Sequence, residues 1–145
     1  MSKFEQMKAA LAAKREEEYR KYIAAMKSWV LEKYPTALEV EDGLFVVKEV
    51  ANDLPKTTFG DFIQVHYTGK FTDGKLFDTS HKRNKPFAFI VGEGSVIAAW
   101  DKGLQHFSKG EKGLLIASYK LAYGESGAAP TIPPKCTLIF EVEIV

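Results

Sequence analysis

Twelve aromatic side chains lie between Phe59 and Val145, in a stretch with a single cysteine and no group of residues spaced to bind a metal. Large aromatic rings usually fill protein cores, but so many in one short stretch can also line a pocket. Such a pocket would hold an apolar group away from water and would contain no nucleophile to attack it. The twelve residues are Phe59, Phe62, Tyr67, Phe71, Phe77, Phe87, Phe89, Trp100, Phe107, Tyr119, Tyr123 and Phe140.

The motifs of several common catalytic sites are absent. The three histidines, His66, His81 and His106, are too few and too scattered for a metal site. No GxSxG motif supports a Ser-His-Asp site. Gly92-Glu93-Gly94 lacks the full GxGxxG pattern of a dinucleotide site and is better explained as a turn.

Two charged features remain to be explained. Lys82-Arg83-Asn84-Lys85 is a small basic cluster without interleaved aromatic residues, which indicates a solvated loop. Asp78, beside Phe77, is the one carboxylate that could lie among the aromatic rings. The alternative is an aspartate that caps a turn or forms an ion pair.

The composition indicates one domain with an appendage. Of the 145 residues, 46% are hydrophobic and 27% charged, which suits one modest core and a soluble surface. The net charge of +1 gives no general case for binding nucleic acid or acidic membranes. The chain has no apolar run near the roughly 20 residues of a membrane helix and no apolar segment of a signal peptide. We therefore expect a cytoplasmic protein.

Residues 3–34 are predicted to form one long helix. Apolar residues recur at steps of three and four, and Ala, Glu, Lys and Arg fill most other positions. Pro35 should end the helix, because a proline disfavours helical geometry in the residue before it. The apolar positions are Phe4, Met7, Leu11, Tyr19, Tyr22, Ile23, Met26, Trp29, Val30 and Tyr34.

The pattern leaves three roles open for this helix. Its apolar face is interrupted near residues 14–18, which argues against a regular coiled coil. The helix could rest on its own globular domain, or it could bind a partner or a membrane surface. It could also self-associate as a homodimer through Tyr22, Met26, Trp29 and Val30.

After Pro35 the pattern becomes typical of β-strands. Between residues 62 and 68, Ile63, Val65 and Tyr67 alternate with polar residues. Asp73-Gly74 indicates a tight turn into a returning strand at 75–78. Further strands are predicted at residues 44–50, 86–91, 112–119 and 137–145.

One short helix is predicted inside the domain. Ser95 could cap a helix from Val96 to Lys102, which Gly103 would end. Five or six short strands and this helix predict an α+β fold, in which one helix lies across an antiparallel sheet. Trp100 would then face the concave side of the sheet, where Tyr67, Phe87 and Phe140 could point to form a pocket.

From about residue 44 to the C-terminus, several motifs follow one another in unbroken order. They are Val65-His66-Tyr67-Thr68-Gly69, Asp73-Gly74-Lys75-Leu76-Phe77-Asp78-Thr79-Ser80, Arg83-Asn84-Lys85-Pro86-Phe87-Ala88-Phe89, Trp100-Asp101-Lys102-Gly103-Leu104, Ala122-Tyr123-Gly124, Ile132-Pro133-Pro134 and Leu138-Ile139-Phe140-Glu141-Val142. One such piece is a weak signal, whereas the ordered set is specific. In this order it resembles the FKBP-type peptidyl-prolyl cis–trans isomerases, enzymes that rotate X–Pro bonds.

The resemblance implies a curved antiparallel sheet wrapped around a short helix, here preceded by a long N-terminal helix. In such a site Trp100 would be the floor under the proline ring, and the Tyr123 hydroxyl and the Ile97 N–H would hold carbonyl oxygens. Phe77 and Ile132 would lie at the rim with Asp78. The implied residues are Tyr67, Phe77, Asp78, Trp100 and Tyr123 as the catalytic set, Phe87, Val96, Ile97, Ile132 and Phe140 as substrate-binding residues, and Arg83 behind them.

The resemblance also implies partners and domains. Proline-containing peptides, unfolded proteins and macrolide inhibitors of the tacrolimus and rapamycin type would bind, and no cofactor, metal, nucleic acid or membrane is implied. Residues 1–35 would be a helical extension, 36–58 a connecting segment with a first strand, and 59–145 the isomerase domain. The loop 125–131, with Ala128 where many members carry a bulkier or polar residue, departs from the family. This departure bears on substrate preference and macrolide affinity.

Two alternative functions stay open at this point. The pocket could belong to a non-catalytic module that binds proline-containing peptides. The N-terminal helix could make the protein a dimeric folding chaperone, since some bacterial members resemble this arrangement.

Overall fold

The N-terminal helix α1 runs from Lys3 to Lys33 in the computed structural model, which describes residues 1–145. Ser2 caps the helix, because its Oγ accepts a hydrogen bond from the Glu5 N–H at 3.1 Å. Tyr34 leaves helical geometry, and Pro35 follows. The predicted helix is confirmed to within one residue.

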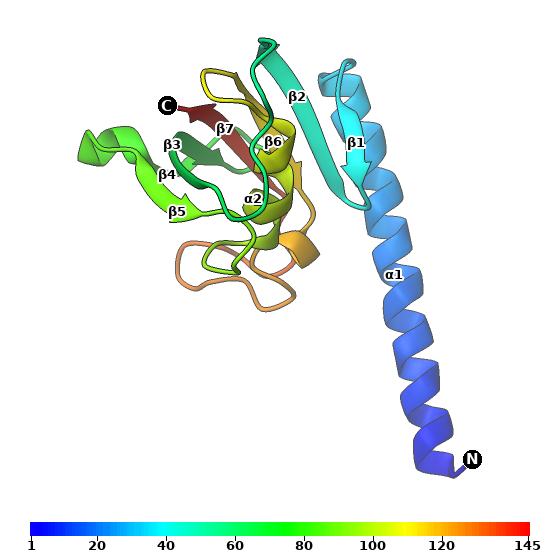
Figure 1. Cartoon of the computed structure of the whole chain (residues 1–145). Helices are drawn as coiled ribbons and strands as arrows, with labels where there is room; N and C mark the ends of the chain where they lie inside the picture. Colours follow the sequence, from blue (N-terminus) through cyan, green and yellow to red (C-terminus); the bar gives the residue numbers. More distant parts are fainter.

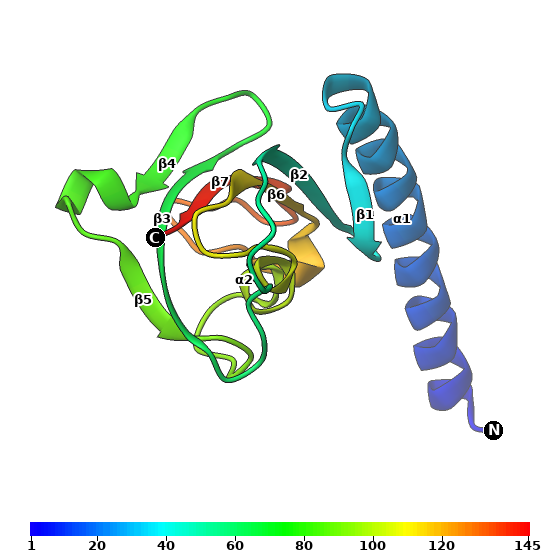
Figure 2. The same ribbon diagram turned by 45° about the horizontal axis from the view of Figure 1, so that its top comes forward.

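Seven strands form one antiparallel sheet that curves around a short helix, α2 (Ala98–Gly103) (Figures 1 and 2). The neighbours in order are β1 (Leu38–Glu41), β2 (Leu44–Val50), β6 (Lys112–Ala117), β7 (Leu138–Ile144), β3 (Phe62–Lys70) and β4 (Leu76–Thr79). β5 (Phe87–Ile90) pairs with the first half of β3. Three short 3₁₀ helices complete the chain: η1 (Ser80–Arg83), η2 (Leu104–His106) and η3 (Tyr119–Leu121). The predicted α+β class is confirmed.

Two details differ from the sequence prediction. The additional strand is β1, a short edge strand whose Leu38 is exposed, so no alternating pattern of burial marks it. The short helix begins two residues later than predicted, after Ile97. Ser95 does not cap it, and the N-cap position has no side-chain hydrogen bond.

The concave face of the sheet carries the main core. Side chains of β3 and β7 alternate, so that Val65, Tyr67 and Phe140 point inward against Trp100 of α2 and Leu104 of η2. Because α2 fills the centre of the curve, any space between it and the strands is lined by these inward side chains.

The convex face of the sheet is apolar as well, and α1 covers it. Tyr19, Ile23, Met26 and Val30 are buried, at steps of four, three and four. They pack against residues of β2, β6, β7 and η3, namely Phe45, Val47, Leu114, Ile116, Tyr119 and Ile139. The helix therefore rests on its own domain, the first of the three predicted roles.

This packing gives no support to the alternative in which Tyr22, Met26, Trp29 and Val30 form a homodimer interface. Met26 and Val30 are buried in the convex-face core, and Tyr22 and Trp29 pack against it. The same chain thus covers Met26 and Val30 fully, and Tyr22 and Trp29 in part.

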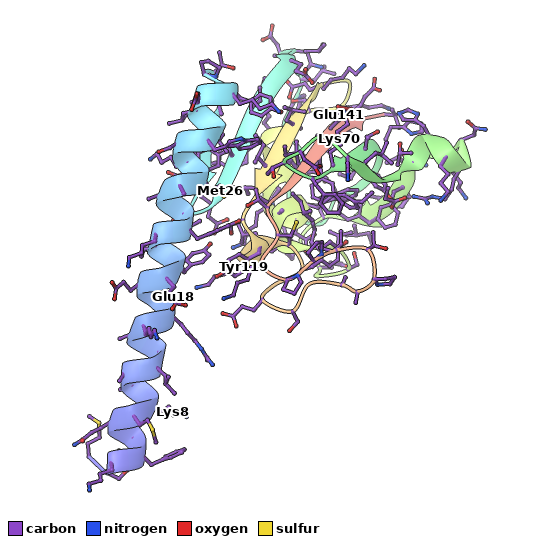
Figure 3. All side chains as sticks on the ribbon, turned by 180° about the vertical axis from the view of Figure 1, so that it is seen from behind. Lys8, Glu18, Met26, Lys70, Tyr119 and Glu141 are labelled. Atoms are coloured by element: carbon purple, nitrogen blue, oxygen red, sulfur yellow. The ribbon has the colours of Figure 1, made fainter.

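The N-terminal part of α1 projects beyond the domain (Figure 1; Lys8 in Figure 3), whereas Glu18 lies beside it. Every residue before Tyr19 is exposed, including Phe4, Met7 and Leu11. Neither α1 nor α2 is long and apolar enough to cross a membrane.

A buried carboxylate joins the segment after β2 to the turn before β6. Glu111 is fully buried and lies 2.6 Å from Lys48 Nζ and 3.2 Å from Lys56 Nζ. It also accepts hydrogen bonds from the N–H groups of Asn52 at 2.9 Å and Ser108 at 2.7 Å. Burial alone would raise the pKa of Glu111, but these donors outweigh it and lower the pKa to about 2.

Replacing this carboxylate should give a pH-dependent loss of stability. Because the folded-state pKa lies below the ordinary 4.5, the stabilisation is complete above pH 4.5 and is lost as the pH falls toward 2. We expect Glu111→Gln to lower the free energy of unfolding by about 1–3 kcal/mol at pH 7. Urea unfolding should show that the difference in free energy of unfolding between the wild type and Glu111→Gln is smaller at pH 3 than at pH 7. Exposed Glu49→Gln is the matched control, and a difference that is equal at both pH values would contradict the assignment.

Candidate active site

An apolar cavity of about 420 Å³ opens on the concave side of the sheet, beside α2. Eight of its ten lining residues are hydrophobic, so it suits a small apolar group. The strands β3, β4, β5 and β7, the segment before α2, α2 itself and the loop after η3 all contribute. The lining residues are Tyr67, Phe77, Asp78, Phe87, Ser95, Val96, Ile97, Trp100, Tyr123 and Phe140.

Trp100 forms the centre of the aromatic lining. Its ring centroid lies 4.8 Å from that of Tyr67, 5.6 Å from Phe140 and 5.8 Å from Phe87, and each pair is close to perpendicular. Such edge-to-face contacts are favourable because the positive ring edge meets the negative ring face. The Trp100 indole N–H is buried without a hydrogen-bond acceptor, in keeping with surroundings that are almost wholly aromatic. The cavity therefore has a rigid and apolar base.

A glycine in β3 allows Phe77 to reach the cavity. The Phe77 ring lies directly over Gly69, where an added Cβ would come within 2.4 Å of the ring. From this position Phe77 meets Phe140 at 5.8 Å between centroids and an interplanar angle of 81°. Any larger residue at position 69 would displace the ring from the cavity wall.

One polar network borders the cavity. The Tyr67 hydroxyl donates to Asp78 Oδ2 at 2.5 Å and accepts from Arg83 Nη2 at 2.7 Å. Arg83 Nη1 also lies 3.4 Å from Asp78 Oδ1, which accepts from the Thr79 N–H at 2.9 Å. The Asp78 carboxylate is thus held from three sides.

The network moves both pKa values away from neutrality. Burial alone would raise the pKa of Asp78, but the hydrogen bonds from Tyr67 and Arg83 outweigh it, so this pKa is lowered. Burial and the Asp78 carboxylate raise the pKa of Tyr67 to about 12. At neutral pH Asp78 is therefore ionised and Tyr67 is protonated.

Several hydrogen-bond donors at the cavity have no partner in the chain, and two of them are important for the argument. The Ile97 N–H and the Tyr123 hydroxyl take part in none of its hydrogen bonds. Asp101 fixes the turn that leads to Ile97, since its carboxylate accepts from the N–H groups of Gly92 at 2.8 Å and Gly94 at 2.9 Å. These free donors can bind carbonyl oxygens of a guest.

The structure brings together most of the site residues named from the sequence. Arg83 lies behind the cavity, bonded to Tyr67 and Asp78. Ile132 does not line the cavity. It is buried in the concave-face core, where its N–H and C=O pair with Ala128 at 2.9 Å each, and not at the rim. The named residues that do line the cavity are Tyr67, Phe77, Asp78, Phe87, Val96, Ile97, Trp100, Tyr123 and Phe140.

Two residues of the site were missed as such in the sequence. Ser95 was predicted as a helix cap but lines the cavity. Asp101 holds the turn before Ile97. The sequence signal for this role is an acidic residue that follows shortly after a glycine-rich turn. No cluster of three or more His, Cys, Asp or Glu side chains could hold a metal ion.

Comparison with known proteins points to one family. Residues 55–145 match the family model of the FKBP-type peptidyl-prolyl cis–trans isomerases. The Mus musculus "peptidyl-prolyl cis-trans isomerase FKBP2" is 47% identical over 100 residues, which are 68% of this chain and 71% of that protein. The "FK506-binding protein 1A" of Aspergillus fumigatus is 48% identical over 93 residues, 64% of this chain and 81% of that protein.

A solved structure agrees with these sequence matches. The crystal structure of AtFKBP13 superposes with a TM-score of 0.66 at 36% identity, over 69% of this chain and 89% of that one. The family match begins after α1, β1 and β2, so the long helix lies outside it. The aromatic cavity and the matches over most of the domain lead to the same conclusion: the chain belongs to the FKBP-type peptidyl-prolyl cis–trans isomerase family.

Proposed function

We propose that the aromatic cavity binds the proline ring of peptides and unfolded proteins and accelerates rotation about the preceding X–Pro bond. The observation that carries this proposal is an apolar cavity with Trp100 at its centre and two unpaired donors, the Ile97 N–H and the Tyr123 hydroxyl, beside it.

The mechanism follows from the electronic structure of the amide. Resonance keeps the X–Pro bond planar and gives a rotation barrier of about 18–20 kcal/mol. The planar amide carries negative charge on its oxygen, which water stabilises and an aromatic cavity does not. The twisted amide has lost resonance and is less dipolar at oxygen, so it loses less on entering the cavity. A cavity that favours the twisted form lowers the barrier by differential binding.

The polar groups would orient the chain around the turning bond. The Ile97 N–H and the Tyr123 hydroxyl would bind carbonyl oxygens on either side of the proline. The ionised Asp78, held by Tyr67 and Arg83, would interact electrostatically with the twisted carbonyl group. No covalent bond is broken in this reaction, so none of these groups acts as a nucleophile.

Macrolides of the tacrolimus and rapamycin type should compete for the same cavity. The Aspergillus fumigatus relative is named an FK506-binding protein, and the aromatic lining here offers the same kind of apolar surface. A cytoplasmic location stays a prediction.

Removing cavity side chains should lower the activity of the folded protein. We expect Trp100→Ala, Phe77→Ala and Asp78→Ala each to lower kcat/KM for a proline peptide by about tenfold or more, because each removes part of the wall that fits the twisted amide. A coupled isomerisation assay measures this, and Phe62→Ala on the exposed surface is the control. Equal rates for all variants would remove the cavity from the reaction. Binding of the peptide by the wild type without turnover would instead favour a non-catalytic module.

The activity should not depend on pH near neutrality. Since the pKa of Asp78 is lowered and that of Tyr67 is raised to about 12, neither group changes charge between pH 6 and 9. We expect kcat/KM to vary less than about twofold over this interval. A fall in kcat/KM with an apparent pKa near 7 that persists in Asp78→Asn would show that another titrating group takes part.

A single methyl group at position 69 should disturb the site. Gly69→Ala places a Cβ against the Phe77 ring, so Phe77 must leave the cavity wall. We expect kcat/KM to fall about as far as in Phe77→Ala, and the double variant should be no worse than either single one. Additive losses in the double variant would contradict this explanation.

A further inference from the structure

The loop between β6 and β7 carries one residue of the cavity. It runs from Ser118 to Thr137 and carries Tyr123, which is 41% exposed and lines the cavity. The Tyr123 hydroxyl makes no hydrogen bond within the chain. Its place at the cavity therefore depends on how the backbone of the loop is held.

Both ends of this loop are tied to α1 by tyrosine hydroxyls. The Tyr19 hydroxyl is hydrogen-bonded to Oγ of the fully buried Ser118 at 2.7 Å. The Tyr22 hydroxyl is hydrogen-bonded to Oγ1 of Thr137. Because residues three apart share one face of a helix, a single turn of α1 holds the start and the end of the loop.

The same two tyrosines hold the first residue of η3. The Tyr119 ring lies edge-on to Tyr19 with centroids 5.4 Å apart, and its centroid lies 4.8 Å from that of Tyr22. Figure 3 shows Tyr119 on the side of the domain that faces α1. Three aromatic rings in mutual contact restrict one another more than any one pair would.

The backbone of Tyr119 passes this restraint to Tyr123. The Tyr119 carbonyl accepts hydrogen bonds from the N–H groups of Ala122 at 3.1 Å and Gly124 at 2.8 Å, the two neighbours of Tyr123. The Gly124 carbonyl in turn accepts from the Lys135 N–H at 3.2 Å. This bond joins the first part of the loop to the part that leads back to β7. A continuous set of contacts thus leads from α1 to the cavity residue.

We propose that Tyr19 and Tyr22 are positioning residues, which act through Tyr119 to hold Tyr123 where its hydroxyl meets the substrate carbonyl. This inference rests on the proposed function, since it assigns Tyr123 a contact with substrate. We call Tyr19 and Tyr22, with their contacts to Ser118, Tyr119 and Thr137, the tyrosine clamp. The helix that supplies it, α1, lies outside the residues matched by the family model, 55–145. The clamp is therefore built by the N-terminal extension of this chain onto the matched domain.

The test removes the two hydroxyls and keeps the rings. In the full-length chain we expect the Tyr19→Phe/Tyr22→Phe variant to lower kcat/KM for a proline peptide by about three- to tenfold, mainly through a higher KM. In a Tyr123→Phe background the same pair of substitutions should cause no further loss. A double-mutant cycle of this kind separates an effect through Tyr123 from a general loss of stability, which would act equally in both backgrounds.

The matched control removes a hydroxyl just after the end of the same helix, at its C-cap. Tyr34 ends α1 and packs against the convex-face core, and its hydroxyl makes no hydrogen bond within the chain. Tyr34→Phe should leave kcat/KM unchanged. Unchanged kinetics in Tyr19→Phe/Tyr22→Phe, or the same loss with and without the Tyr123 hydroxyl, would overturn the proposal.

Hydrogen exchange tests the clamp without relying on activity. The Gly124 amide should exchange at least about tenfold faster in Tyr19→Phe/Tyr22→Phe than in the wild type or in Tyr34→Phe, because its acceptor Tyr119 is less restrained. If the wild type lacks isomerase activity, the proposed function fails by itself, and the Gly124 exchange rate still decides whether the clamp exists. Unchanged exchange at Gly124 would overturn it.

Discussion

Strand β6 is apolar on both faces, and this two-sided burial determines how the rest of the chain must pack. Leu115 points into the concave core with Trp100 and Leu104, whereas Leu114 and Ile116 point the other way. A strand of this kind needs a covering layer on each side. The helix α2 supplies one layer and the second half of α1 the other. Fully burying one such side chain contributes about 1.5–3 kcal/mol, so the convex face alone makes α1 part of the domain's core.

Parts of this arrangement can be read in the sequence because strands and helices have fixed periods. The alternation in β3 and β7 indicates which residues face inward, and the motif order adds the identity of the cavity residues. A contact between two side chains that are far apart in the sequence leaves no such periodic pattern. Tyr19 meets Ser118 and Tyr22 meets Thr137 only because β6 and β7 lie under the same helix face. For the same reason the pattern of α1 could not decide between its own domain and a second subunit.

The other errors of prediction have local causes. β1 was missed because an exposed edge strand of four residues buries too little to show a period of two. Ile132, predicted at the rim from its motif, is buried in the concave-face core and is not among the residues that line the cavity. Motif order identifies residues that are near a site, and loop geometry decides which of them face it.

The charges around the cavity are arranged differently from those of an acid–base enzyme. General acid–base catalysis works best with a group whose pKa lies near the working pH. Here the contact between Tyr67 and Asp78 raises one pKa and contributes to lowering the other, so both groups keep one protonation state. Asp101 has a different role, as a fixed acceptor for two turn amides. An ionised Asp78 and a protonated Tyr67 that keep their protonation states near neutral pH suit the proposed reaction, in which no proton moves.

The two halves of α1 are stabilised by different means, and one depends on the other. Starting a helix in water is unfavourable, whereas extending an existing one adds a hydrogen bond for each residue fixed. The docked half from Tyr19 onward is held by the convex-face core and provides that start. The projecting half buries nothing but is rich in alanine. Where the two halves join, the i,i+4 pairs Glu16–Arg20 at 2.8 Å and Glu17–Lys21 at 3.4 Å add modest support. Because the tyrosine clamp lies in the first turns of the docked half, the segment that orders the projecting helix is also the segment that holds the cavity loop.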